Sequence, residues 1–229
     1  MVLGPNGSGK STMVQIAALQ LHPSAGEVEV LGERLGHTDV RSLRRRVGYA
    51  SAALGAMLRP ALSARDVVMT AKFAALEPWW HDYDDDDRRA AVACLARLGV
   101  DRFADRSWGT LSSGEQQRVL VARTLMGPIG LVLLDEPNAG LDVGGRENLL
   151  AGLDDLARDP STPAMVLVTH HVEEIPPSFT HALLLRDGRV GAAGPLATTL
   201  TGDALSGTFG VDLTLERRPN GRYAAYAST

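Results

Sequence analysis

Apolar residues along the chain fall into short runs, and the spacing within each run predicts its secondary structure. Val28 and Val30 alternate with glutamates between two glycines, which is the period of a half-exposed strand. Continuous apolar runs at 131–134 and 164–168 are typical of strands that are buried on both faces of a parallel sheet. The pattern therefore predicts a sheet whose central strands are covered on both sides.

Helical patterns lie between these strand-like runs. Residues 10–21 and 88–98 each carry a helical pattern that is followed by a helix-ending proline or glycine. Ser63 is placed to cap a further helix. Residues 58–108 therefore read as a mainly helical insert between segments that carry strands.

Two hairpins are predicted in the last quarter of the chain. The runs at 181–185 and 189–193 flank an Asp-Gly pair, which is a common hairpin turn. Alternating apolar residues at 211–215 are followed by Asn-Gly, which could turn the chain back toward Tyr223.

Composition excludes several classes of protein. The 229 residues are 45% hydrophobic and 22% charged, which is ordinary for a globular protein. The net charge of -4 gives no basic footprint, so no nucleic-acid partner is expected. Cys94 is the only cysteine, so no disulfide framework is possible within the chain. The longest apolar stretch, 119–134, contains an arginine and a Gly-Pro pair and is not a membrane span.

Residues 77–87 combine two tryptophans, a tyrosine and four consecutive aspartates. The segment lacks the glycine and the terminal glutamate of a calcium-binding loop. Its aspartates are expected to solvate a surface loop and to favour the N-terminus of the next helix. For Trp79, Trp80 and Tyr83, packing beneath the loop and contact with a partner both remain open.

The first dozen residues fit the phosphate-loop pattern of glycine, four residues, then Gly-Lys-Ser. Glycines let the backbone approach a ligand without a Cβ, so that exposed amides form a nest for phosphate oxygens. Lys10 adds a positive charge for the outer phosphates, and Ser11 offers a hydroxyl oxygen to Mg²⁺. The candidate nucleotide-binding residues are Gly4, Pro5, Asn6, Gly7, Ser8, Gly9, Lys10, Ser11 and Thr12.

Two acidic residues follow the buried run at 131–134, at the strand end where open α/β sheets bind ligands. Asp135 is expected to hold Mg²⁺, directly or through water. Glu136 is placed to polarise a water for attack on a γ-phosphate. ATP and Mg²⁺ are therefore the expected ligands.

Residues 111–118 read Leu-Ser-Ser-Gly-Glu-Gln-Gln-Arg and lead into an apolar helix. Ser112 and Glu115 fit a capping box, which would make the segment a capped helix and nothing more. The other interpretation is a second helix terminus that binds phosphate.

With these motifs in this order, the chain resembles the ATP-binding cassette (ABC) family over nearly its whole length. Residues 4–12 match the Walker A motif of the family, 111–115 look like its signature motif, and 131–136 match Walker B with the adjoining catalytic glutamate. Gly140-Leu141-Asp142 is similar to the D-loop, and Thr169-His170 to the switch histidine.

The resemblance implies an α/β P-loop NTPase fold, with a mainly parallel sheet flanked by helices. It also implies an inserted helical subdomain and an incomplete N-terminal β-subdomain. A single ABC ATPase domain would span 1–229. Residues 1–57 and 109–229 would form the RecA-like core, and 58–108 the helical subdomain that leads up to the signature motif.

The resemblance further implies a homodimer in which each ATP lies between Walker A of one subunit and the signature motif of the other. Ser112 and Gly114 would contact the γ-phosphate in trans, and Asp142 of the D-loop would also be one of the nucleotide-binding residues. The catalytic residues would be Glu136, His170 and Lys10. ATP hydrolysis would energise a membrane permease at the inner face of the cell membrane. The alternative is a soluble ABC ATPase in regulation, translation or repair.

Three features depart from the family pattern. Ser113 and Glu115 replace the usual Gly and Gln of the signature motif, which keeps its serine and second glycine. Ala52 stands where the Q-loop glutamine is expected. Few residues precede the phosphate loop, so we expect the genomic frame to continue upstream of Met1 and to supply an aromatic residue for adenine. Otherwise Tyr49 or a partner subunit would have to hold the base.

Overall fold

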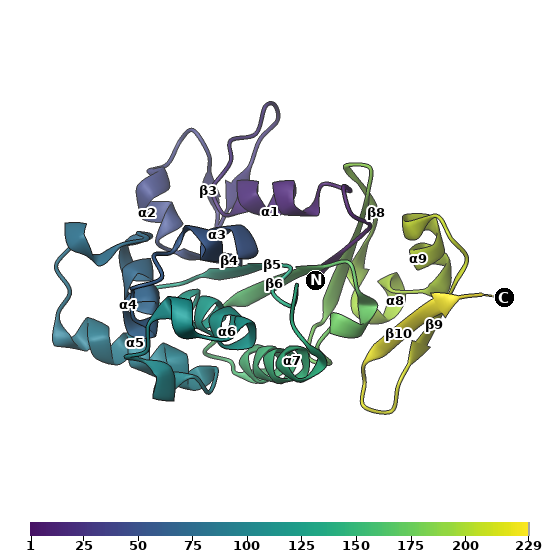
Figure 1. Ribbon diagram of the computed structural model, residues 1–229. Coiled ribbons are helices and arrows are strands. Elements are labelled where there is room, and N and C mark those ends of the chain that lie inside the picture. The colour runs from purple at the N-terminus through teal and green to yellow at the C-terminus, as the bar shows by residue number, and fades with distance from the viewer. Residues whose placement is uncertain (229) are drawn as a thin grey trace.

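A six-stranded sheet forms the centre of the computed structural model, which describes residues 1–228 (Figure 1). Its strand order is β4-β5-β6-β1-β7-β8; the first five of these are joined by parallel pairing, and β8 pairs antiparallel with β7. The mainly parallel α/β sheet predicted from the sequence is therefore confirmed. The strands are β1 (Val2–Leu3), β4 (Val47–Ser51), β5 (Leu131–Asp135), β6 (Ala164–Thr169), β7 (His181–Arg186) and β8 (Arg189–Pro195).

Helices cover both faces of this sheet. Figure 1 shows α1 (Lys10–Ala17) and α3 (Ala52–Met57) over one face, and α6 (Ser113–Arg123) and α7 (Val143–Arg158) over the other. Consecutive residues of β5 accordingly enter different cores: Leu133 packs with the α1 side, whereas Leu134 packs with the α6 and α7 side. Side chains alternate along a strand, so a continuous apolar run is needed where both faces are covered.

The first helix is shorter than its sequence pattern predicts. We expected it over 10–21, but α1 ends at Ala17. Leu19 adopts a φ of 60° in the left-handed region, which takes the chain out of the helix. The chain then leads through the small hairpin of β2 (Glu29–Val30) and β3 (Glu33–Arg34) to α2 (Val40–Arg44).

All regular elements between residues 58 and 108 are helical, as the sequence indicates. They are α4 (Ala64–Met69), α5 (Asp85–Arg97) and the short 3-10 turns η1 (Thr70–Phe73), η2 (Pro78–Trp80), η3 (Asp101–Phe103) and η4 (Trp108–Thr110). Ser63 caps α4, as predicted. The division of the chain into a core and a helical subdomain at these boundaries stays a prediction.

The aspartate-rich segment begins a helix, as expected from its charge. α5 starts three residues earlier than predicted, because Asp84 caps it and forms a reciprocal capping box with Asp87. Trp79 and Trp80 are 59% and 83% exposed, whereas Tyr83 packs against the core. The tryptophans therefore do not pack beneath the loop.

Both predicted C-terminal hairpins are present. β7 pairs with β8, and β9 (Leu213–Arg217) pairs with β10 (Tyr223–Ala227). α8 (Leu196–Thr199) and α9 (Gly202–Phe209) join the two hairpins, and Figure 1 shows β9 and β10 outside the central sheet. Among residues 1–228, no helix has the length and apolar character needed to cross a membrane.

Candidate active site

The loop between β1 and α1 packs tightly against β7. A Cβ at Gly4 would lie 2.0 Å from the backbone oxygen of Leu185, so only glycine fits there. Gly9 has a φ of 97° and caps α1 from the left-handed region. The turn between β7 and β8 also supports the loop, since the Gly188 amide donates to the Ser8 oxygen at 3.0 Å.

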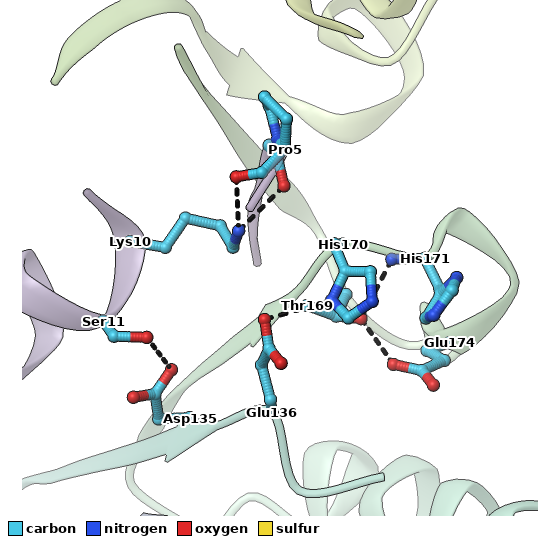
Figure 2. Close-up of polar contacts among 10 residues, drawn as sticks. Pro5, Lys10, Ser11, Asp135, Glu136, Thr169, His170, His171 and Glu174 are labelled. Carbon is cyan, nitrogen blue, oxygen red and sulfur yellow. Dashed lines mark hydrogen bonds and ion pairs between the residues drawn. The ribbon is translucent and has the colours of Figure 1, made fainter. Parts of the chain in front are cut away.

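The Lys10 side chain contacts the backbone of the phosphate loop that precedes it. Its Nζ donates to the backbone oxygens of Gly4 at 2.8 Å and Pro5 at 2.9 Å, as Figure 2 shows. Burial lowers the pKa of Lys10, an effect that the nearby Glu136 and Asp135 carboxylates oppose. A pocket of about 240 Å³ opens beside it and is lined by Asn6, Gly7, Gly9, Lys10, Ser11, Thr12 and Glu136.

Ser11 and Asp135 are far apart in sequence but form a hydrogen bond in the folded chain. The Ser11 hydroxyl donates to Asp135 Oδ1 at 3.0 Å, across a separation of 124 residues in sequence. Asp135 ends β5 and is 7% exposed, and this burial raises the pKa of its carboxyl group.

The Ser11 hydroxyl and the Asp135 carboxylate fit Mg²⁺, which prefers oxygen ligands. Magnesium is commonly held by one or two carboxylates together with substrate phosphates and waters. No cluster of three or more His, Cys, Asp or Glu side chains suited to a metal occurs in the described part of the chain.

Glu136 leaves the sheet directly after β5. Its φ of 48° lies in the left-handed region, which non-glycine residues rarely adopt, and its amide donates to the Val168 oxygen at 3.0 Å. In this conformation Glu136 Oε1 lies 3.0 Å from His170 Nδ1. Both side chains are 30% exposed, and Glu136 also lines the pocket beside Lys10.

The loop that carries His170 is stabilised by hydrogen bonds between its own residues. The Thr169 hydroxyl donates to the Glu174 carboxylate and accepts a hydrogen bond from the His171 amide at 3.1 Å (Figure 2). Glu174 is 6% exposed. Sequence reasoning missed Glu174; the only available signal was an acidic residue five positions after a strand-ending threonine.

Ser112 forms the capping box that the sequence predicts. Its Oγ accepts from the Glu115 amide at 3.3 Å, and its own amide donates to Glu115 Oε2 at 2.7 Å. Asp142 likewise caps α7 by accepting from the Gly145 amide at 2.6 Å. A Cβ at Gly114 would lie 3.6 Å from the Cα of Gly145, so the starts of α6 and α7 adjoin.

The structure does not join the signature residues to the phosphate loop of the same chain. None of the hydrogen bonds found in residues 1–228 connects Ser112, Gly114 or Asp142 to residues 4–12. Their phosphate contacts therefore stay a prediction, one that concerns a second subunit.

Tyr49 lies in β4, the strand that pairs with β5, and Ala52 directly follows β4 as the first residue of α3. Ser51 pairs in register with Asp135 and caps α3, which begins with an exposed Ala52. Ser51 is 6% exposed, and sequence reasoning missed it as a polar neighbour of the site. Tyr49 is 8% exposed and packs in the core on the α1 side, and its suggested contact with adenine stays a prediction.

Comparisons with known proteins agree with this geometry. Residues 1–139 match the model of the ABC transporter family. The chain is 39% identical to the uncharacterized ABC transporter ATP-binding protein YlmA of Bacillus subtilis, over 91% of this chain and 79% of that protein. It is 36% identical to the hemin import ATP-binding protein HmuV of Nocardia farcinica, over 91% and 70%.

A solved structure shows the same fold. The dimeric structure of the bacterial ABC transporter cassette MJ0796 superposes with a TM-score of 0.71 at 28% identity, over 85% of this chain and 84% of that one. With its phosphate loop, its buried Asp135 and its Glu136–His170 pair, the chain belongs to the ABC transporter family, as an ATP-binding subunit whose ATP hydrolysis energises a membrane transporter.

Proposed function

We propose that two copies of this chain bind two ATP molecules between them, and that each copy hydrolyses the ATP in its own phosphate loop. The contact between Glu136 and His170 beside the Lys10 pocket carries this proposal. It places a carboxylate and a polar partner next to a loop built for phosphates, which is the arrangement that water attack on a phosphate needs.

The proposed roles follow from the contacts of each side chain. Lys10 exchanges its bonds to the Gly4 and Pro5 oxygens for the β- and γ-phosphates. Ser11 and Asp135 would hold Mg²⁺, which supplies charge neutralisation for the phosphates. Glu136 orients the attacking water and accepts its proton, while His170 holds the Glu136 carboxylate in place and senses the γ-phosphate.

The second half of each site is proposed to come from the partner copy. Ser112 and Gly114 lie at the N-terminus of α6, where free amides and the helix dipole favour a phosphate group. We propose that their phosphate belongs to the ATP bound in the phosphate loop of a second copy. The dimeric structure of the similar cassette MJ0796 supports the association of two copies.

The complex is proposed to act at the inner face of the cell membrane, bound to a permease. This partner is supported by the names of YlmA, an ABC transporter ATP-binding protein, and HmuV, a hemin import ATP-binding protein. Residues 1–57 and 109–229 are proposed as the ATP-binding core, and 58–108 as the helical subdomain.

Two variants test the assignment. Lys10→Ala is expected to weaken ATP binding about 10- to 100-fold, since it removes a charged hydrogen bond to phosphate. Glu136→Gln is expected to keep ATP binding and to slow turnover by about 10²–10⁴, because the general base is lost. Fluorescent-nucleotide titration and phosphate release measure the two effects.

Light scattering adds a test of the composite site. Glu136→Gln is expected to accumulate as a dimer in ATP and to remain a monomer in ADP. Exposed Glu216 offers a matched control, because Glu216→Gln makes the same chemical change in the C-terminal hairpin. If Glu136→Gln hydrolyses ATP at the parental rate, the general base is another residue. If the variant stays monomeric in ATP, the composite site is refuted.

A further inference from the structure

The guanidinium group of Arg222 joins two separate elements beside the site. Its Nε donates to the backbone oxygen of Glu173 at 3.2 Å, and a second guanidinium nitrogen donates to the same oxygen. A third nitrogen forms an ion pair with the Glu147 carboxylate on α7. The Arg222 side chain is 20% exposed, so this fork is largely shielded from water.

Arg222 directly precedes β10, and a residue of that strand also contacts the His170 loop. The Ala225 amide donates to Glu173 Oε1 at 3.3 Å. Leu213 and Ala225 line a pocket of about 200 Å³ together with His170 and His171. The C-terminal hairpin therefore lies against the outer side of the loop that carries His170.

The same loop is held on its inner side by Thr169 and Glu174. In sequence, His170 lies between Thr169 and Glu174. It precedes by three residues Glu173, whose backbone oxygen accepts from Arg222. Glu147 stands five residues after Asp142, the cap of α7. Arg222 thus links the loop of the proposed switch histidine to the helix that begins at the D-loop.

We propose that Arg222 is a positioning residue for ATP hydrolysis, which holds the His170 loop so that His170 stays against Glu136. The proposal rests on the proposed role of His170. Without the Arg222 contacts, the loop lets the His170 imidazole occupy more positions. Small misplacements of catalytic groups slow reactions strongly. Arginine is suited to the task because its rigid planar fork presents separate donors to the carbonyl and to the carboxylate, whereas a lysine offers a single compact charge on a flexible stem.

The first experiment measures steady-state ATP hydrolysis by the full chain and by Arg222→Ala. Turnover is expected to fall about 2- to 30-fold, the range found when residues along a coupling network are changed. KM for ATP is expected to stay at the parental value, because the phosphate-loop contacts are untouched. Arg222→Lys is expected to restore little of the lost turnover, and Glu147→Gln to lose part of it.

Arg218→Ala is the matched control. Arg218 lies in the same hairpin, carries the same charge and is exposed. Its variant is expected to hydrolyse ATP like the parent. Thermal melting of each variant measures the folded fraction, by which turnover is divided. Should Arg222→Ala fail to fold, Arg222→Lys and Glu147→Gln provide the same comparison.

A double-variant cycle separates positioning from general stability. If Arg222 acts through His170, then Arg222→Ala causes no further loss of turnover in a His170→Ala background. An equal fractional loss in both backgrounds would overturn the proposal, as would parental turnover of Arg222→Ala alone. Parental turnover of His170→Ala is a different result: it would refute the proposed role of His170 itself.

Discussion

His170 Nδ1 lies 3.0 Å from Glu136 Oε1, although 34 residues separate the two positions. Both residues follow the ends of neighbouring parallel strands, with Asp135 of β5 in register with Val168 of β6. The left-handed backbone at Glu136 takes its side chain out of the strand direction, and Figure 2 shows the two side chains pointing toward one another. The carboxylate is therefore oriented by a loop from the adjacent strand.

This contact predicts different consequences for two adjacent histidines. His170→Ala is expected to lower turnover about 10- to 100-fold, because the Glu136 carboxylate loses the partner that orients it. KM for ATP is expected to change little. His171→Ala is the control, since the ring centroid of His171 lies 4.0 Å from that of His170 but no hydrogen bond from His171 to Glu136 is found among the described residues. Equal losses in both variants would argue against a specific role for His170.

Asp135 is expected to make the nucleotide-free protein less stable at neutral pH. Burial raises the pKa of its carboxyl group in the folded state above the ordinary value of 3.8. The folded state therefore favours the protonated form, a contribution that is present below the unfolded pKa and lost as pH rises through the folded pKa. Asp135→Asn removes the buried charge and retains an oxygen that can accept from Ser11.

Asp135→Asn should therefore raise the melting temperature of the nucleotide-free protein near neutral pH. The gain should shrink as pH falls into the range of ordinary carboxyl groups, about 4. ATP hydrolysis should be lost in the same variant. Calorimetry at a series of pH values measures the effect, with Asp212→Asn as an exposed control. A lower melting temperature for Asp135→Asn would contradict the burial argument.

Ala52→Gln tests the departure at the Q-loop. Ala52 follows Ser51, whose register partner is Asp135, so a glutamine there starts close to the proposed Mg²⁺ site. We expect the variant to raise basal ATP turnover or the apparent affinity for Mg²⁺. Ala53→Gln is a matched control, because Ala53 is also exposed and lies one residue further along α3. No change in either quantity would indicate that other groups have taken over the task of the glutamine.

Local patterns explain which elements could be predicted. The continuous runs of β5 and β6 and the capping serines at 63 and 112 were correctly interpreted, since each signal lies within a few residues of its effect. The end of α1 was wrong by several residues. No glycine or proline marks Leu19, and its left-handed conformation depends on packing, because its side chain is buried in the core on the α1 side.

The sequence by itself determined the chemistry of the phosphate loop, because a turn that exposes amides to an anion needs only consecutive residues. It also determined that Asp135 and Glu136 end a buried strand. Only the tertiary structure decided which side chains contact Asp135 and Glu136. The strand order places β6 beside β5 and β1 beside β6, and thereby joins Ser11 to Asp135 and His170 to Glu136. The contact of Arg222 with Glu173 was equally hidden, since pairing between distant residues depends on how the whole chain packs.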